Sequence, residues 1–85
     1  MNYRLVYTQR AIKDIQRLSP DIEKRIGKTL NRYKQAPLSH AEKLKDPRLG
    51  SYRFRIGDYR VIFDLEGPEI VVLRVGHRSD IYRKF

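Results

Sequence analysis

Apolar residues recur at two spacings along the chain, and each spacing predicts a different kind of element. Residues 3–7 are rich in β-forming side chains and alternate, which favours a strand. Between residues 9 and 34 the apolar side chains return every three or four positions, as they do on one face of a helix. Past the middle of the chain the alternation resumes, and it predicts strands over residues 52–56, 59–65 and 70–75.

The helical segment divides into two helices at a pair of capping signals. Thr8 suits the N-cap of the first helix. Ser19 and Pro20 suit the N-cap and first position of a second helix that ends near Lys34. The apolar stripes are Ala11, Ile12, Ile15 and Leu18 in the first helix, and Ile22, Ile26, Leu30 and Tyr33 in the second. The other face of the second helix carries Lys24, Arg25, Lys28 and Arg32. We expect the two helices to form a hairpin.

The predicted element order is β-α-α-β-β-β, in one domain that spans residues 1–85. This order indicates an α+β fold, with the helical hairpin packed on one face of a small, mainly antiparallel sheet. The last three strands form a meander, and the strand over 70–75 is the most apolar, so we expect it at the centre. Residues 35–50 form a connector, within which residues 43–45 are either a turn or a short strand.

Positive charge is the strongest feature of the composition. The chain has 19 Lys and Arg against 10 Asp and Glu, which gives a net charge of +9. Such a field attracts polyanions, although the same charge can also serve solubility alone. Cysteine is absent, which removes disulfides and thiolate chemistry and agrees with a reducing cytoplasm, where we expect the protein to act. We expect no membrane segment, because no stretch approaches the ~20 apolar residues that one requires.

The alternation in the second half places arginines together on the face of the sheet away from the helices. If residues 57–58 form a two-residue hairpin turn, Arg55 lies opposite Arg60 and Arg53 lies opposite Ile62. Like charges at directly opposed positions are destabilising, and a bound phosphate would relieve the repulsion. Guanidinium groups also match phosphate in a bidentate way. The sequence therefore favours an anion-binding site on this face.

A second interpretation of the same face is a solvated surface of no further function, as many antiparallel sheets have. Only Asp64 offers an obvious neutralising partner on the same strand face. Arg74 fits neither interpretation, because strand parity would place it under the helices unless a bulge, another loop register or an edge position intervenes. We therefore leave Arg74 outside the candidate site.

Two motifs resemble the RelE/ParE superfamily of toxins, and the resemblance covers essentially the whole chain. The first is Leu-Gly-Ser-Tyr-Arg-Phe-Arg-Ile-Gly-Asp-Tyr-Arg-Val-Ile at residues 49–62, and the second is Val-Gly-His-Arg at 75–78 followed by Asp-Ile-Tyr at 80–82. The resemblance implies a RelE-like fold and a bacterial or archaeal toxin of a type II toxin–antitoxin pair. RelE-like members cut mRNA in the ribosomal A site, whereas ParE-like members poison DNA gyrase. Both kinds are neutralised by a small antitoxin.

The resemblance also implies roles for the strand arginines. Arg53 and Arg55 stand where RelE-like toxins carry two basic residues that act on the 2′-hydroxyl and the scissile phosphate. Arg60 matches an arginine that contacts phosphate. The sequence departs from the best-studied members at the first two positions, since those members use lysines there.

The tail and the connector supply the remaining matches. Arg78 matches a tail arginine that acts on the leaving side of the reaction, and Tyr82 matches a tyrosine that stacks on or orients a base. Lys45 matches a basic residue before the sheet, with a spacing that is uncertain by one residue. We also expect Lys45 and the four cations of the second helix to contact RNA of the ribosome.

Proton transfer is the weak point of a site built from arginines, because their pKa lies above about 12. His77 is the natural candidate for the general base by its pKa, and the alternative is a tail histidine that only caps or packs. His40, in the connector, is expected to be plain surface. No His, Asp and Glu residues have the spacing of metal ligands, so we expect neither a metal nor another cofactor.

Three functions remain open on the sequence. The first is a ribosome-dependent, metal-independent mRNA endonuclease that inhibits translation, with the ribosome, mRNA and a cognate antitoxin as partners. The second is a ParE-like toxin that inhibits gyrase without nuclease activity. The third is a degenerate member that only binds its antitoxin. The joint presence of Arg53, Arg55, Arg60, Arg78 and Tyr82 favours the first.

Overall fold

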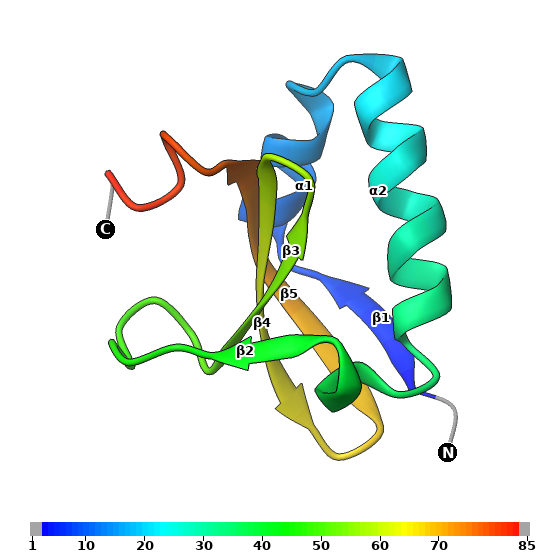
Figure 1. Cartoon of the computed structure of the whole chain (residues 1–85), viewed down its shortest axis with the longest axis vertical. Helices are drawn as coiled ribbons and strands as arrows, with labels where there is room; N and C mark the ends of the chain where they lie inside the picture. The colour runs from blue at the N-terminus through cyan, green and yellow to red at the C-terminus, as the bar shows by residue number, and fades with distance from the viewer. Residues whose placement is uncertain (1–2, 84–85) are drawn as a thin grey trace.

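A computed structural model describes residues 3–83 and contains a five-stranded sheet with two helices packed on it (Figure 1). The strands are β1 (Arg4–Tyr7), β2 (Ala41–Lys43), β3 (Tyr52–Ile56), β4 (Tyr59–Glu66) and β5 (Glu69–His77). The helices are α1 (Gln9–Gln16) and α2 (Pro20–Tyr33), and a short 3₁₀ turn covers Pro37–Ser39. The strand order is β1-β5-β4-β3-β2, with only β1 and β5 parallel. The expected α+β fold with a mainly antiparallel sheet is confirmed.

Both helices begin where the sequence predicts. The Thr8 side chain accepts a hydrogen bond from the Ala11 amide at 3.1 Å, which satisfies one free donor of α1. At the start of α2, Pro20 occupies the first turn, although Ser19 makes no side-chain capping bond. The two helices form the expected hairpin, and α2 runs along one side of the sheet (Figure 1).

The core lies between the helices and one face of the sheet. Phe54 is fully buried and packs among Ile26 and Leu30 of α2 and the neighbouring strands. Its ring stacks on Phe63 with centroids 4.3 Å apart. Phe54 and Ile56 alternate with Arg53 and Arg55 along β3, so burial of the first pair turns the arginines to the opposite face.

The predicted register of the β3–β4 hairpin is confirmed. Arg55 lies opposite Arg60 and Arg53 lies opposite Ile62. The turn requires Gly57, whose φ of +59° is unfavourable for other residues. A Cβ at Gly57 would lie 2.8 Å from a guanidinium nitrogen of Arg25, but this long side chain can move aside, so the positive φ is what favours glycine here.

A register shift in the β4–β5 pair resolves the placement of Arg74. The shift lies between Ile62 and Phe63, so that Arg74 lies opposite Ile62 and not under the helices. Its guanidinium pairs with Asp14 of α1 at 2.7 and 3.3 Å, and Asp14 also accepts the Val75 amide at 3.0 Å. The pairing of β1 with β5 ends at Val72, and the Asp14 carboxylate binds the edge of β5 just past that point.

One further prediction needs correction. The connector contains β2, which begins at residue 41 and pairs with β3, whereas we expected a turn or short strand at 43–45. The most apolar strand, β5, lies inside the sheet between β4 and β1, as its sequence predicted.

The face away from the helices is partly covered by the C-terminal tail. Ile62 and Ile81 are 0% and 2% exposed on this face, outside the main core. Ile81 packs over Gly76 of β5, where a Cβ would lie 3.6 Å from the Cβ of Ile81, at ordinary contact distance. The tail is thereby held next to the arginines. Within residues 3–83, neither helix is long and apolar enough to cross a membrane.

Candidate functional site

Arg60 is the most buried charged residue among those described, at 6% exposure. One of its terminal nitrogens donates to the carbonyl oxygens of Gly57 and Tyr59, each at 2.9 Å, so the hairpin backbone fixes the guanidinium. Burial lowers the pKa of Arg60, and the positive charge of Arg55 lowers it further. An arginine remains protonated nevertheless, so Arg60 is a fixed positive charge with little solvent around it.

The charges of the other candidate arginines act on Arg60. The charges of Arg53 and Arg78 also lower the pKa of Arg60, while Tyr82 opposes the shift. The register brings Arg55 and Arg53 to the site on β3, and the tail brings Arg78 and Tyr82. We call Arg53, Arg55, Arg60, Arg78 and Tyr82 together the arginine cluster.

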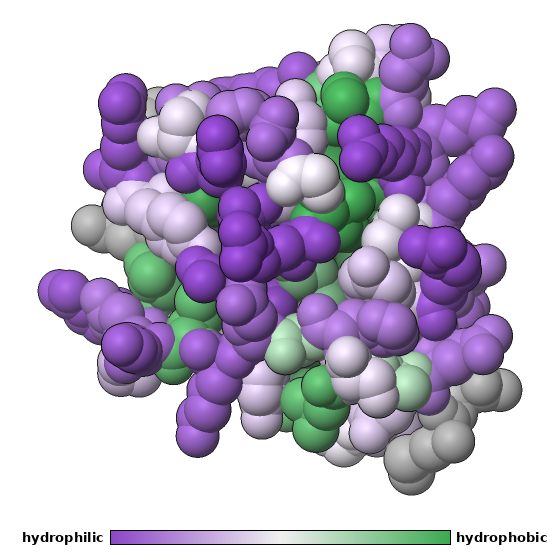
Figure 2. Space-filling model, viewed as in Figure 1, coloured by the Kyte–Doolittle hydropathy of each residue, from purple (hydrophilic) through white to green (hydrophobic). Residues whose placement is uncertain are grey.

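The tail is attached to the cluster at two points. The Arg78 amide donates to the Asp58 carbonyl at 2.8 Å, and the two side chains approach to 3.8 Å. Arg53 donates to the Tyr82 hydroxyl at 2.7 Å, and this bond raises the pKa of Arg53. Hydrophilic side chains cover most of the face shown in Figure 2, over the strands as well as over α2.

The carboxylate beside these arginines is Glu42 and not Asp64. One oxygen of Glu42 lies 3.2 Å from Nε of Arg53 and 3.8 Å from Nε of Arg55. Asp64, the partner that the sequence suggested, accepts the Ser51 amide at 2.8 Å and so holds the connector. The expectation for Asp64 was therefore wrong.

The structure does not bring His77 to the arginine cluster. His77 lies opposite Tyr59, whose side chain packs against the main core, and the two rings meet edge to face at 5.4 Å. Its Nδ1 lies 2.8 Å from the Ser79 hydroxyl and 3.1 Å from the Ser79 amide. Arg60 is on the other face of the sheet, so His77 packs and caps at the strand end.

The predicted RNA-contacting cations fall into two groups. Lys45 lines a hollow together with Arg53 and Tyr82, which places it beside the arginine cluster. The α2 cations Lys24, Arg25, Lys28 and Arg32 are exposed on the helical side of the molecule. Arg25 reaches the Gly57 turn, so positive charge continues from α2 to the tip of the β3–β4 hairpin. Within residues 3–83, no three His, Asp or Glu side chains form a group that could hold a metal ion.

Known proteins resemble the chain over most of its length. A model of the family described as the ParE toxin of the type II toxin–antitoxin system parDE matches residues 5–82. Toxin RelG of Mycobacterium tuberculosis is 32% identical over 87 residues, which is 99% of this chain and 100% of the relative. The chain belongs to the RelE/ParE toxin family.

Solved structures of RelE/ParE toxins share the fold. The toxin–antitoxin complex RelBE2 of Mycobacterium tuberculosis has a chain that matches with a TM-score of 0.83 at 26% identity, over 92% of this chain and 100% of that chain. The RelB–RelE complex of Methanococcus jannaschii matches with a TM-score of 0.73 at 27% identity, over 94% and 98%. This RelE/ParE toxin thus places the arginine cluster on the strand face opposite its helical hairpin.

Glu42 is the functional candidate of this RelE/ParE toxin that sequence reasoning missed. It lies directly opposite Arg53 in the β2–β3 pair, and its side chain is 47% exposed. The feature that could have revealed Glu42 is the short strand β2. A strand that begins at residue 41 would have paired an acidic residue with the arginines of β3.

Proposed function

We propose that this toxin is a RelE-type, ribosome-dependent mRNA endonuclease that inhibits translation. The observation that carries the proposal is the register that sets Arg55 opposite the buried Arg60, with Arg53 on the same strand face and bonded to the Tyr82 hydroxyl. The charges of Arg53 and Arg78 also act on Arg60. A set of cations that repel one another is stabilised by an anion between them, and a phosphodiester has the matching charge and bidentate geometry.

The arginine cluster suits the charge that develops in RNA cleavage without a metal. The 2′-oxygen attacks the adjacent phosphorus while the bond to the 5′-oxygen breaks, which leaves a 2′,3′-cyclic phosphate and a 5′-hydroxyl. Negative charge accumulates on the phosphorane, and fixed cations in a partly desolvated site stabilise it without reorganisation. Arg60 is held by the backbone for this role, and Arg55 faces it across the hairpin.

Glu42 is the group that we propose as acceptor of the 2′-hydroxyl proton. A carboxylate is a common general base, whereas an arginine is a poor one. Glu42 forms ion pairs with both Arg53 and Arg55, so a phosphate bound to these arginines would place its nucleotide next to the carboxylate. The leaving 5′-oxygen then takes its proton from solvent near Arg78, whose side chain is exposed.

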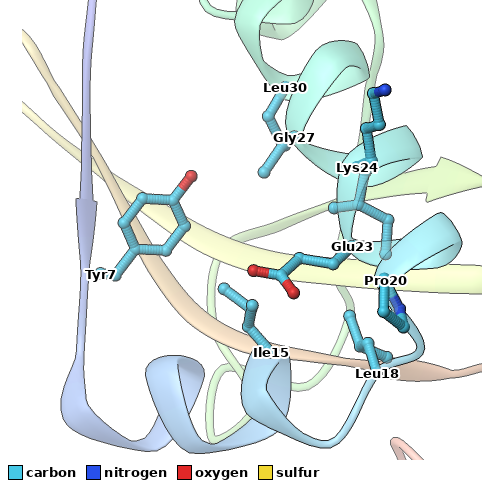
Figure 3. A pocket seen from close by; sticks show the side chains of 9 residues that line it. Tyr7, Ile15, Leu18, Pro20, Glu23, Lys24, Gly27 and Leu30 are labelled. Carbon is cyan, nitrogen blue, oxygen red and sulfur yellow. The ribbon is translucent and has the colours of Figure 1, made fainter.

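A partner antitoxin is part of the proposal, because the solved relatives named above are toxin–antitoxin complexes. A hollow of about 460 Å³ lies between β1 and the helical hairpin, and its walls include Ile15, Leu18 and Leu30 (Figure 3). The Tyr7 hydroxyl and the Glu23 carboxylate point into it. Burial raises the pKa of Tyr7. Apolar side chains of an antitoxin would cover this surface.

The second candidate function is gyrase inhibition, which the match to the ParE family model favours. One experiment separates the two functions. Purified protein is added to a reconstituted translation system and, separately, to a gyrase supercoiling assay. We expect mRNA cuts only during translation and unchanged supercoiling. Intact mRNA with inhibited supercoiling would refute the nuclease. As a control for the effect of positive charge alone, Arg4→Gln removes an arginine charge at the opposite edge of the sheet and should behave like the wild-type protein in both assays.

A further inference from the structure

Two hollows adjoin the ion pair of Arg74 and Asp14, at the end of β5 where the tail leaves the sheet (Figure 1). One, of about 510 Å³, lies along α1, and the other, of about 410 Å³, extends to Ile81 of the tail. Asp14, Arg17 and Arg74 line both, so we call the two hollows together the α1 groove. Asp14 and Asp80 are its carboxylates. Its cations are Arg10, Lys13, Arg17, Arg74 and Arg83.

The positive charge of α1 has little compensation within the protein. Lys13 and Arg17 are exposed and lie four positions apart, and like charges at this spacing on a helix repel each other. The one carboxylate of α1, Asp14, is bound to the Arg74 guanidinium and the Val75 amide. Within residues 3–83, no carboxylate forms an ion pair with Lys13 or Arg17. A surface that serves solubility alone interleaves both signs, so this arrangement favours a polyanion.

The α1 groove adjoins the arginine cluster through the tail. Arg60 lies opposite Gly76 in the β4–β5 pair, and Ile81 packs over Gly76. Ile81 also lines the groove, and neighbouring strands of a sheet are only ~4.8 Å apart. An RNA strand with one phosphate at Arg60 can therefore cross the tail at Ile81 and bring the phosphates of adjoining nucleotides to Arg17.

We propose that the α1 groove binds phosphates of the RNA strand that lies on the arginine cluster, outside the nucleotides that are cut. Lys13 and Arg17 are the side chains that contact these phosphates. Each phosphate that they neutralise releases counterions, which raises affinity without reading the bases. The proposal rests on the RNA binding proposed above, but it does not require cleavage. It also makes affinity depend on the length of the RNA, because a short RNA occupies the arginine cluster alone.

The test compares two RNAs that cannot be cut, a 2′-O-methyl trinucleotide and a 2′-O-methyl dodecanucleotide, by fluorescence anisotropy. Lys13→Gln and Arg17→Gln should each weaken binding of the dodecanucleotide by about 1.4- to 5-fold. Each should also reduce the slope of log affinity against log salt by about 0.7. Binding of the trinucleotide should stay at the wild-type affinity in both variants.

The matched control is Arg4→Gln, which removes the same charge outside the groove, beside the start of β5. It should leave the affinity for both RNAs unchanged. A second measurement needs no substitution, because the Nε–H signals of arginines can be followed by NMR in the wild-type protein. We expect the Arg17 signal to shift with the dodecanucleotide and not with the trinucleotide, and the Arg4 signal to shift with neither.

The outcomes separate the groove from the nuclease. Wild-type affinity and salt slope in both α1 variants would overturn the groove, and so would an equal loss of affinity for both RNAs. Variants that bind the dodecanucleotide normally but the ribosome more weakly would overturn the path of the strand and assign the groove to ribosomal RNA. Weaker dodecanucleotide binding by the variants of a protein that cuts no mRNA during translation would uphold the groove and refute the nuclease.

Discussion

Replacement of Glu42 by glutamine should change cleavage and RNA binding in opposite directions. The change removes one negative charge that lies 3.2 Å from Nε of Arg53 and 3.8 Å from Nε of Arg55. It keeps an oxygen that can accept the Arg53 hydrogen bond, so the local geometry is retained. The arginines then attract a phosphate without an internal competitor, while the proposed proton acceptor is lost.

The two effects differ greatly in size. The Glu42 side chain is 47% exposed, so solvent screens the pair with Arg53, and exposed ion pairs contribute about 0.2–1 kcal/mol. Binding of an RNA that cannot be cut should therefore tighten by about 1.4- to 5-fold. Loss of a general base lowers the rate by about 10²- to 10⁴-fold. The free energy of unfolding should change by less than about 1 kcal/mol.

Three measurements on Glu42→Gln check this expectation. They are the cleavage rate in a reconstituted translation system, the affinity for a 2′-O-methyl RNA by fluorescence anisotropy, and denaturant unfolding. The matched control is Glu69→Gln, which removes a carboxylate from the exposed pair with Arg4 and leaves the arginine cluster intact. Cleavage by Glu42→Gln at the wild-type rate would refute its role as proton acceptor. Weaker RNA binding would refute the competition between Glu42 and phosphate.

Other changes test the remaining parts of the structure. Arg55→Gln should weaken RNA binding and reduce the slope of log affinity against log salt by about one, measured by anisotropy; an unchanged slope would place Arg55 outside the phosphate contacts. Asp14→Ala should lower the free energy of unfolding by about 3 kcal/mol in denaturant titration, because Asp14 pairs with Arg74 and the two side chains are only 10% and 13% exposed. A loss below about 1 kcal/mol would contradict this. Gly27→Leu should weaken antitoxin binding, measured by calorimetry, without loss of stability, because Gly27 lines the hollow of Figure 3 and a Cβ there meets nothing within 4 Å. Asn31→Leu on the exposed side of α2 is its control, and equal affinities would refute the docking site. His77→Gln should leave the cleavage rate within about twofold, and a loss of tenfold or more would restore His77 as the general base.

The parts of the fold that the sequence predicted correctly depend on local rules. Thr8 and Pro20 mark helix starts because capping involves only neighbours in the chain. The turn at Gly57 fixes the register of β3 and β4, and that register alone sets Arg55 against Arg60. The larger part of the arginine cluster could therefore be placed before the structure was known.

The parts that the sequence did not predict depend on contacts between distant segments. The bulge that moves Arg74 to Asp14 has no local signature, since α1 and the end of β5 meet only in the folded chain. Strand β2 is three residues long, too short for alternation to reveal it, and so Glu42 was missed. The tail motif identified which residues could act, but not the side of the sheet that each one faces, which follows from the strand register. This register separates His77 from Arg78.

The most direct test of the central proposal is a single 2′-deoxynucleotide in the mRNA, at the position where the wild-type protein cuts during translation. Attack by the 2′-oxygen requires that hydroxyl, so we expect cleavage at this position to disappear while cuts at unmodified positions remain. The unmodified cuts should end in a 2′,3′-cyclic phosphate and a 5′-hydroxyl. Cleavage that persists at the deoxynucleotide would contradict the proposed role of the arginine cluster and Glu42.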